Sequence, residues 1–590
     1  MSPNANRTGG HRALRILSRI LLFAISLIFT CLLVFLALEA LPGDAATQRL
    51  GLQATPERVA ELTQQYGLDK PVLYRFVLWC AHALQGDFGT VLASGLPVAD
   101  AMVGPLARTG VIFAISLVLV IVVGTAGGIF AGLHGGKAAD KIVSTLALAV
   151  VGTPEFVVGF FLILVFATQL GWFPAVSLLP VGSGSMFDKP IIMVLPIVAI
   201  SLIGACTLVR PVRAVVEREN QTLHVESARL SGLPERRVIV KNLLPGIIAP
   251  VAQSAASVVP YLIGGTVIIE SLFSFPGLGT LLVNAVLNRE PDLLMACSAV
   301  VIAVSLAAFW ISGWEGGGPV RSKHSVSEKL LSWPDFVLLV FFVAFLALAL
   351  AGSLSPTDGT STVGAAFMPP SAEHPLGTDG LGRDVLARLM HGGAHLIAVA
   401  AVSTAVAAAV GVALGFAVSA KGRFADVLSY LLDLLLVIPS ILVVMVLVFG
   451  LGSGVGTMIV VTTAVSAPYI ARYTRSLVRP VAASPYVTAA RLSGDSAAKT
   501  AVREVLPNLA VPLATTVGMR FINSVYLVAT AAFLGFDPLG TGSDWGTMIQ
   551  TGVTGISLNP WAALAPTIAI ACITISGNLL LDRIGKRSNL

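Results

Sequence analysis

Long apolar stretches alternate with short polar segments along almost the whole of the 590-residue chain. Each stretch has about 20 residues, enough for an α-helix to cross roughly 30 Å of hydrocarbon. The pattern predicts about twelve spanning helices, at residues 20–41, 109–133, 142–169, 190–209, 247–270, 293–313, 334–352, 393–418, 427–452, 455–474, 508–535 and 561–582. We therefore expect an all-α polytopic membrane protein.

Composition supports this reading, with 55% hydrophobic residues, 12% charged residues and a mean hydropathy of +0.87. The net charge of +6 could indicate nucleic-acid binding, but the basic residues flank apolar stretches and lack interleaved aromatic residues. A positive-inside bias explains them better, and no nucleic-acid partner is expected. The five cysteines are dispersed without metal-ligand spacing, so we expect buried small side chains and no metal site.

The distribution of lysine and arginine predicts the topology. Placing the N-terminus inside makes residues 1–19, 134–141, 210–246, 314–333, 419–426, 472–507 and 583–590 cytoplasmic. These segments hold 27 of the 37 basic residues. Residues 20–41 exceed the usual apolar length of a signal peptide and lack a well-placed cleavage site, which favours a retained anchor. We expect a cytoplasmic-membrane protein with both termini in the cytoplasm.

One polar motif occurs twice, 262 residues apart. The first copy runs from Glu226 to Gly232 and reaches Pro245, and the second runs from Thr488 to Gly494 and reaches Pro507. Other features repeat as well. Arg210 and Arg213 correspond to Arg472 and Arg475, and Pro154 corresponds to Pro439. The small residues Gly124, Gly128 and Gly132 correspond to Gly411, Gly415 and Ser419. The small residues indicate closely packed helices, an interpretation favoured over a specific role in a pore. The chain is predicted to contain two parallel six-helix halves.

The predicted halves cover residues 1–313 and 334–590, joined by a Gly-rich and then basic cytoplasmic linker at 314–333. External segments are expected at 42–108 and 353–392, and the repeated motifs occupy cytoplasmic loops 210–246 and 472–507. In each loop a polar helix ends at a glycine, and a proline begins the next span. Such a projecting helix can lie in a groove of a partner protein. An ordinary basic loop is the alternative, which the second copy makes less favoured.

The motif resembles the "EAA" loop of binding-protein-dependent ABC importer permeases, although Ser227 and Thr488 depart from the family pattern. Residues 33–44, 66–71, 86–89 and 273–279 are similar to the first permease of dipeptide, oligopeptide and nickel importers. Residues 374–384, 533–535 and 545–548 are similar to the second. The resemblance implies a type I ABC importer permease fold, with a channel that is normally heterodimeric supplied by one polypeptide.

The same resemblance implies partners and site residues. It implies two ABC ATP-binding subunits inside, which would hold ATP and Mg²⁺, and a solute-binding protein outside. No phosphate-binding G-x4-G-K-[ST] motif occurs in the chain, so we expect neither a cofactor nor ATPase activity of its own. The residues implied in coupling to the ATPases are Glu226, Ala228, Arg229, Gly232, Pro245, Ala490, Arg491, Gly494 and Pro507.

Charged residues within predicted spans are candidates for a translocation path. They are Glu155, Asp433 and Arg520, of which Asp433 is also interpreted as a helix-packing residue. Glu270 lies near an external helix end, where solvation is expected. Peptides are the first expectation for the substrate, followed by nickel or metal chelates, opines and glycosides. Peptide termini are one kind of group that such charges could recognise.

Two other classes of protein are considered. An ion-coupled secondary transporter with two six-helix repeats needs relay carboxylates at midplane, for which few candidates exist, and no repeated basic motif. A membrane scaffold or receptor subunit needs a signalling domain, and the sequence shows none.

Overall fold

The computed structural model describes residues 21, 23–38, 55, 57, 70–92, 94–178, 186–312, 333–350, 359–420, 422–536 and 542–588. Regular structure in these residues is helical, with only isolated β-bridges. Eight of the described helices are long and apolar enough to cross a membrane, and two bent helix pairs raise the number to ten. The protein is therefore an all-α polytopic membrane protein. The predicted linker lies outside the described residues up to 332, and Trp333 begins a helix.

The first half contains the apolar helix Phe23–Leu38 and the elements α4 to α13. Their bounds are α4 Val72–Ala83, α5 Val98–Leu133, α6 Ala138–Val151, α7 Glu155–Leu162, α8 Ile191–Asn220, α9 Leu223–Leu230, α10 Glu235–Val238, α11 Leu244–Leu272, α12 Leu278–Leu287 and α13 Pro291–Ser312. Short π or 3₁₀ segments are Ile163–Gln169, Met186–Asp188 and Ile239–Leu243.

The second half repeats this order. Its helices are α14 Trp333–Leu350, α15 Val385–Ser419, α16 Arg423–Leu435, α17 Ser440–Leu451, α18 Val455–Ala482, α19 Pro485–Leu492, α20 Ala497–Thr500, α21 Leu506–Phe533, α22 Trp545–Gly552 and α23 Trp561–Ser588. Ala501–Val505 is a π segment and Val553–Gly555 a 3₁₀ turn. Apart from α4 and two short segments between α7 and α8, the described α-helices of the two halves therefore correspond one to one.

Several predicted boundaries are wrong. Helix α5 begins at Val98 rather than at 109, and α15 begins at Val385 rather than at 393, so both helices extend into the predicted external segments. Polar residues in the first turns hid these starts, because they lower local hydropathy without ending the helix. Arg108, for example, donates through Nε to the Pro276 carbonyl at 2.7 Å. Helices α12 and α22 were not predicted.

Two predicted spans are sharply bent rather than straight. Helices α6 and α7 meet at 104°, and α16 and α17 meet at 91°. Pro154 and Pro439 stand immediately before the second helix of each pair, in an extended conformation. A proline in this place cannot donate a backbone hydrogen bond to the preceding turn, so the helix restarts in a new direction. The repeated prolines thus mark equivalent breaks.

Glycines bring α5 against α8 and α15 against α18, as the sequence predicted. A Cβ on Gly128 would lie 2.5 Å from the Val212 Cβ and 2.9 Å from the Val209 carbonyl oxygen. A Cβ on Gly415 would lie 2.4 Å from the Thr474 Cβ. Backbones this close leave no room for any side chain at these positions.

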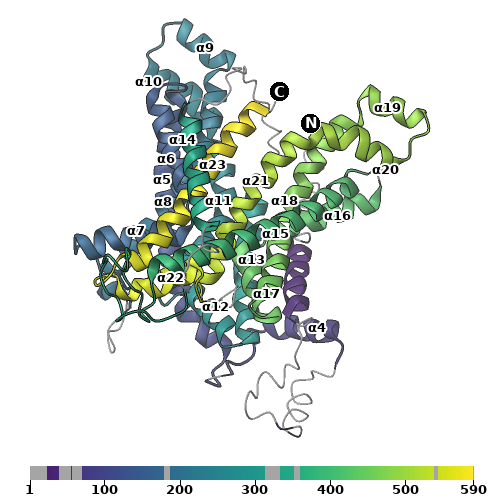
Figure 1. Ribbon diagram of the computed structural model, residues 1–590. Coiled ribbons are helices and arrows are strands. Elements are labelled where there is room, and N and C mark those ends of the chain that lie inside the picture. Colours follow the sequence, from purple (N-terminus) through teal and green to yellow (C-terminus); the bar gives the residue numbers. More distant parts are fainter. Residues whose placement is uncertain are drawn as a thin grey trace, which may run out of the picture.

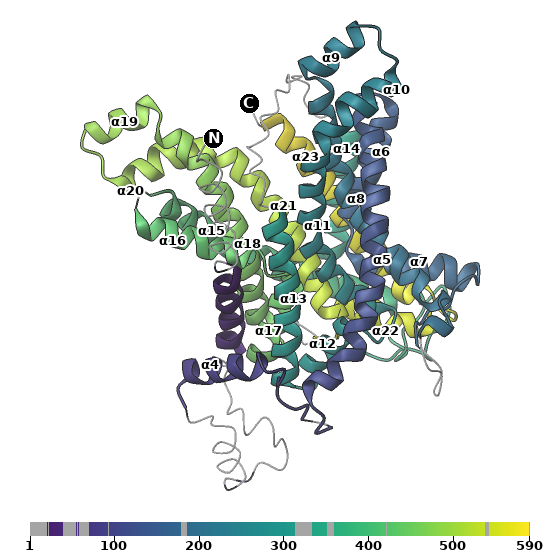
Figure 2. The same ribbon diagram turned by 180° about the vertical axis from the view of Figure 1, so that it is seen from behind.

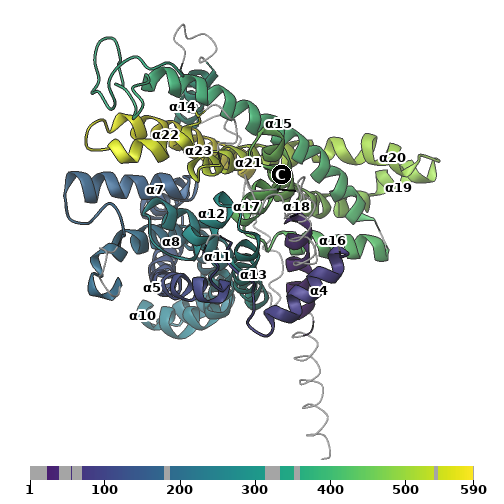
Figure 3. The same ribbon diagram turned by 90° about the horizontal axis from the view of Figure 1, so that it is seen from below.

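The two halves lie side by side and contact each other at several points (Figure 3). Ser26 of the first helix shares a 2.7 Å hydrogen bond with Tyr430 of α16. Arg210 of α8 forms a 2.8 Å ion pair with Asp582 of α23. These contacts join residues that are far apart in sequence, so one folded body contains both halves.

The repeated motifs lie at one end of the molecule, on two separate arms (Figures 1 and 2). Helices α9 and α10 end one arm, and α19 and α20 end the other. Helices α4 and α12 lie at the opposite end. The two copies therefore face the same side, as expected from the charge distribution.

Glu270 contradicts the expectation of a solvated residue, since its side chain is fully buried. Its carboxylate accepts hydrogen bonds from the Thr109 hydroxyl and from the Gly279 backbone N–H at 2.7 Å. It therefore caps the start of α12 and ties the turn after α11 to α5. The burial arises because α12 folds back over this end of the helix, and α12 itself was not predicted.

A compact loop at residues 359–384 precedes α15. The Asp379 carboxylate accepts from the backbone N–H groups of Leu381 and Arg383, at 2.8 and 2.9 Å, and from the side chains of Arg383 and Arg388. Arg388 is only 1% exposed and also donates to the Gly542 carbonyl. These bonds fasten the loop to the segment that leads into α22.

Candidate coupling helices and solute cavity

The first motif copy forms α9, a two-turn helix held at its inner face by Val225 and Ala228, which are buried. Glu226 is exposed. The helix ends at Leu230, and Gly232 follows in the turn. Its φ of +77° is strained for a residue with a Cβ, and nothing lies within 4 Å of the position a Cβ would take. Pro245 lies in the first turn of α11. The sequence prediction of a short helix stopped by a glycine and followed by a proline-started span is confirmed.

Arg229 is held within its own loop. Its guanidinium donates to Glu235 on α10, with Nη2 2.7 Å from Oε1, and to the Asn220 side-chain oxygen at the end of α8, at 2.6 Å. The neighbouring carboxylate raises the pKa of Arg229 above its ordinary value. Arg229 therefore fixes the angle of α9 relative to the helices on either side.

The second copy has the same backbone but different contacts. Helix α19 ends at Leu492, Gly494 follows in the turn with a φ of +91°, and Pro507 lies in the first turn of α21. Arg491 is exposed and has no ion pair among the described residues. Ala497 stands at the position of Glu235, and Ala490 is half-buried on the helix. The two copies therefore offer a partner unequal surfaces.

Sequence reasoning missed an apolar feature of both helices. Leu230 is 83% exposed and Leu492 is 85% exposed, and the two occupy equivalent positions in the repeat. They lie at the ends of the arms, far from the apolar middle of the long helices (Figure 1). The two projecting helices therefore share an exposed leucine at the same place. The sequence did hold a signal for this feature, because a leucine stands at the same position in both copies of the otherwise polar motif.

The upstream arginines connect the arms to neighbouring helices. Arg213 donates to Asp140 of α6, with Nη2 2.7 Å from Oδ2, and Arg475 donates to Ser429 of α16. These are equivalent pairs of elements in the two halves. Each arm is thereby bonded to the bent helix pair of its own half.

A cavity of about 340 Å³ lies where the halves meet. It is lined by α7, α11 and α13 of the first half and by the α16–α17 turn, α18 and α21 of the second. Glu155 and Arg520, both predicted for a translocation path, are brought together in its lining. Tyr261, Tyr469, Asn523 and Tyr526 add polar groups that sequence reasoning did not single out, because isolated polar residues in spans carry no positional signal.

Asp433 is the third residue predicted for a translocation path, and that role stays a prediction. It lies outside the lining of this cavity, and its carboxylate is 3.7 Å from Arg472 Nη1 in a pair whose side chains are 42% and 64% exposed. The alternative interpretation of Asp433 as a helix-packing residue agrees with this geometry, because the pair connects α16 to α18.

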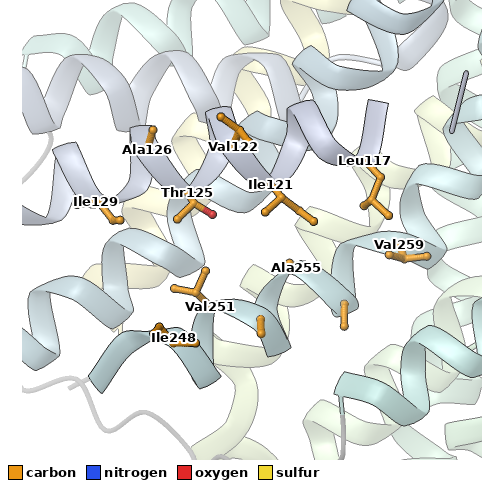
Figure 4. Close-up of a pocket in the computed structure, with 12 residues that line it drawn as sticks. Leu117, Ile121, Val122, Thr125, Ala126, Ile129, Ile248, Val251, Ala255 and Val259 are labelled. Carbon is orange, nitrogen blue, oxygen red and sulfur yellow. The ribbon is translucent and has the colours of Figure 1, made fainter. Parts of the chain in front are cut away.

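A larger groove of about 670 Å³ lies between α5 and α11 (Figure 4). Its lining consists of Leu117, Ile121, Val122, Thr125, Ala126, Ile129, Ile248, Val251, Ala252, Ala255, Ala256 and Val259. The Thr125 hydroxyl is its single polar side-chain group, so the groove has almost no means to orient a polar solute. The smaller cavity between the halves is the better candidate for one.

Two matched helical halves, a polar cavity between them and a pair of projecting helices at one end define a membrane transport permease. The model of the family "Binding-protein-dependent transport system inner membrane component" matches residues 124–314 and 405–589. The model of its N-terminal component matches residues 13–95. The chain belongs to this family, and it carries two permease units of an ABC importer fused in one polypeptide.

Curated relatives include the glutathione transport system permease protein GsiC of Escherichia coli (strain K12) and of Shigella flexneri serotype 5b (strain 8401). Each is 31% identical over 281 residues, which is 48% of this chain and 89% of the relative. One relative therefore corresponds in length to about half of this chain. Family membership also sets aside the secondary-transporter and scaffold alternatives.

Proposed function

We propose that this chain forms the whole channel of an ATP-driven importer, and that two ATP-binding subunits engage α9 and α19. The observation that carries the proposal is the pair of equivalent leucines, Leu230 and Leu492, exposed on projecting helices at one end of the molecule. ATP and Mg²⁺ would be held by the partner subunits. The end of the molecule that carries the two arms would then face the cytoplasm, with both termini on that side.

The remaining expectations fit this scheme. A solute-binding protein would dock at the opposite end, near α4 and α12, and the cavity between the halves would open alternately to either side. The units would be residues 1–313 and 334–590, with 314–333 as linker. Residues Glu226, Ala228, Arg229, Gly232, Pro245, Ala490, Arg491, Gly494 and Pro507 would form or support the coupling surfaces. A short peptide is the favoured substrate, since the family resemblance points to peptides and the relatives are named for glutathione, itself a peptide.

The proposal is tested in proteoliposomes that contain the chain with its ATP-binding subunits and its binding protein. Uptake of labelled dialanine should require ATP. Burying an exposed leucine contributes about 1.5–3 kcal/mol, so Leu230→Asp or Leu492→Asp should weaken ATPase binding roughly 10- to 100-fold. Gln221→Asp, also exposed but outside α9, is the matched control. Uptake that follows a proton gradient without any ATPase would overturn the proposal.

A further inference from the structure

The cavity between the halves is electrically asymmetric although the fold repeats. Glu155 follows Pro154, and the residue that follows the equivalent Pro439 is Ser440, which also lines the cavity. Arg520 corresponds, by the 262-residue offset, to the buried Val258. One half thus supplies a carboxylate and the other a guanidinium, each with an uncharged residue at the equivalent position. A strictly repeated cavity would have carried the same charge twice.

Neither of these two charged groups has an oppositely charged partner in the part of the chain that the structure describes. Glu155 is 1% exposed, and the groups that face its carboxylate are the uncharged hydroxyls of Tyr261 and Tyr526. The buried Nε of Arg520 has no hydrogen bond, and its guanidinium lies 4.3 Å from the centre of the Tyr469 ring. Burying an ion without a partner is strongly unfavourable. Opposite charges that share a cavity without meeting each other leave room for a solute that pairs with both.

Both groups lie midway along membrane-crossing segments. Glu155 is at the break between α6 and α7, in the first turn of α7, and Arg520 is near the middle of α21. Gly265 of α11 lies beside Glu155, where a Cβ would be 3.3 Å from its Cγ. Phe156 stacks on Phe533 of the other half, with ring centres 4.9 Å apart. The carboxylate is therefore held in place at the junction of the two halves.

We infer that this cavity binds a zwitterionic solute, such as a short peptide with free termini, with its ammonium group at Glu155 and its carboxylate at Arg520. This inference rests on the proposed function, because it takes the cavity as the path of the solute. The hydroxyl groups of Tyr261 and Tyr526 and the Asn523 amide supply uncharged hydrogen-bonding groups for the solute's middle. A volume of about 340 Å³ is at the small end for ligand sites, which suits a short peptide.

Other solute classes fit the lining less well. Glu155 is the single carboxylate among the described lining residues, and a guanidinium on the same cavity repels a bare divalent cation. An uncharged glycoside would leave both charges without partners. A zwitterion satisfies both at once.

The test uses the full chain in lipid nanodiscs without partners, so that selection by a binding protein is bypassed. Isothermal titration calorimetry with dialanine, N-acetyl-dialanine and dialanine amide reports the contribution of each terminus. The unmodified chain should bind dialanine roughly 10- to 100-fold more tightly than either blocked peptide. Glu155→Gln should abolish discrimination against the acetylated peptide alone, and Arg520→Gln should abolish discrimination against the amide alone. Asp433→Asn, which lies outside the cavity, should change neither.

Folding is checked by thermal unfolding, and Glu155→Gln should leave the transition temperature equal or higher because it removes an unpaired buried charge. The inference is overturned if dialanine does not bind, if blocked peptides bind as well as dialanine, or if each variant weakens all three probes alike. In these cases ATP-driven uptake by the complete complex would still support the proposed function. Conversely, the chain could prefer dialanine to the blocked peptides while the complete complex shows no ATP-driven uptake. That result would refute the proposed function and still support the specificity of the cavity for a zwitterion. Proton-driven uptake lost in Glu155→Gln would make Glu155 a proton carrier and overturn both.

Discussion

Arg229 and Glu235 form a forked ion pair that joins α9 to α10, with Arg229 Nη2 2.7 Å from Glu235 Oε1. In the other motif copy Arg491 has Ala497 in the corresponding position. The first projecting helix is therefore fixed to its loop by a bond that the second lacks. The second helix is held instead by the buried Val487 and by a 3.1 Å hydrogen bond from Asn508 of α21 to the Tyr486 hydroxyl.

Introducing the missing carboxylate should restrain the second helix. Ala497→Glu is expected to slow amide hydrogen exchange across residues 485–500 by up to about 5-fold, since an exposed pair contributes about 0.2–1 kcal/mol. Ala498→Glu is the control, because it adds the same charge to the same short helix at the neighbouring position. Equal exchange in both variants would show that the effect comes from charge near the helix start rather than from pairing with Arg491.

The glycines that end the projecting helices should tolerate some side chains and not others. Valine at Gly232 and Gly494 should abolish uptake, because a β-branched residue at positive φ costs about 1–3 kcal/mol and shifts the following turn. Asparagine adopts this conformation more readily, and space is open around both positions, so the double Asn variant should retain transport. Uptake in proteoliposomes is compared at equal amounts of inserted protein. Unimpaired transport by the double Val variant would refute the coupling role of the turn.

Helix packing in the first half gives a matched pair of substitutions. Gly128→Val should destabilise the protein by about 1–3 kcal/mol or more, because its Cβ would meet Val212 and the Val209 carbonyl on α8. Gly110→Val, on the same helix, has open space around it and should cost far less. Tryptophan fluorescence during thermal unfolding in detergent measures both. Similar losses would mean that valine in the helix, rather than the approach of α8, is responsible.

The loop before α15 should depend on one carboxylate. Asp379→Asn is expected to cost about 3 kcal/mol, because Arg388 is buried and loses its charged partner. Thermal unfolding at neutral pH measures this loss, and Glu373→Gln, an exposed change in the same loop, is the control.

The same pair predicts a pH dependence. Burial raises the pKa of Asp379, but the backbone N–H of Arg383 and the guanidinium of Arg388 outweigh it and hold the pKa below its ordinary value of 3.8. The ionised form is therefore the stabilising one above that value, and its contribution is lost as pH falls through the lowered pKa. The stability difference between the unmodified chain and Asp379→Asn should accordingly shrink only below about pH 3.8. A difference that shrinks nearer neutral pH would contradict the pairing.

Features of local covalent geometry were predictable from sequence. Gly232 and Gly494 end helices and Pro154 and Pro439 precede new ones because their backbones permit few alternatives. The close approach at Gly128 and Gly415 was predictable for the same reason. What escaped prediction depends on tertiary contacts. Glu270 is buried by a helix that folds back, and Asp433 pairs with Arg472 outside the lining of the cavity that holds Glu155 and Arg520. Hydropathy along a chain records how apolar a segment is, and not which way its few polar side chains face.

Because the two halves contribute opposite charges to the cavity, joining them in one chain affects how the channel can assemble. If the halves were separate proteins, a channel mispaired from two first halves would place two carboxylates at the cavity, and one from two second halves would place two guanidiniums. Like charges in a confined apolar setting repel and would leave such channels unable to hold a dipolar solute. A single polypeptide also keeps its halves at a high effective concentration, however scarce the protein is. Every folded chain thus has one carboxylate, Glu155, and one guanidinium, Arg520, at its cavity.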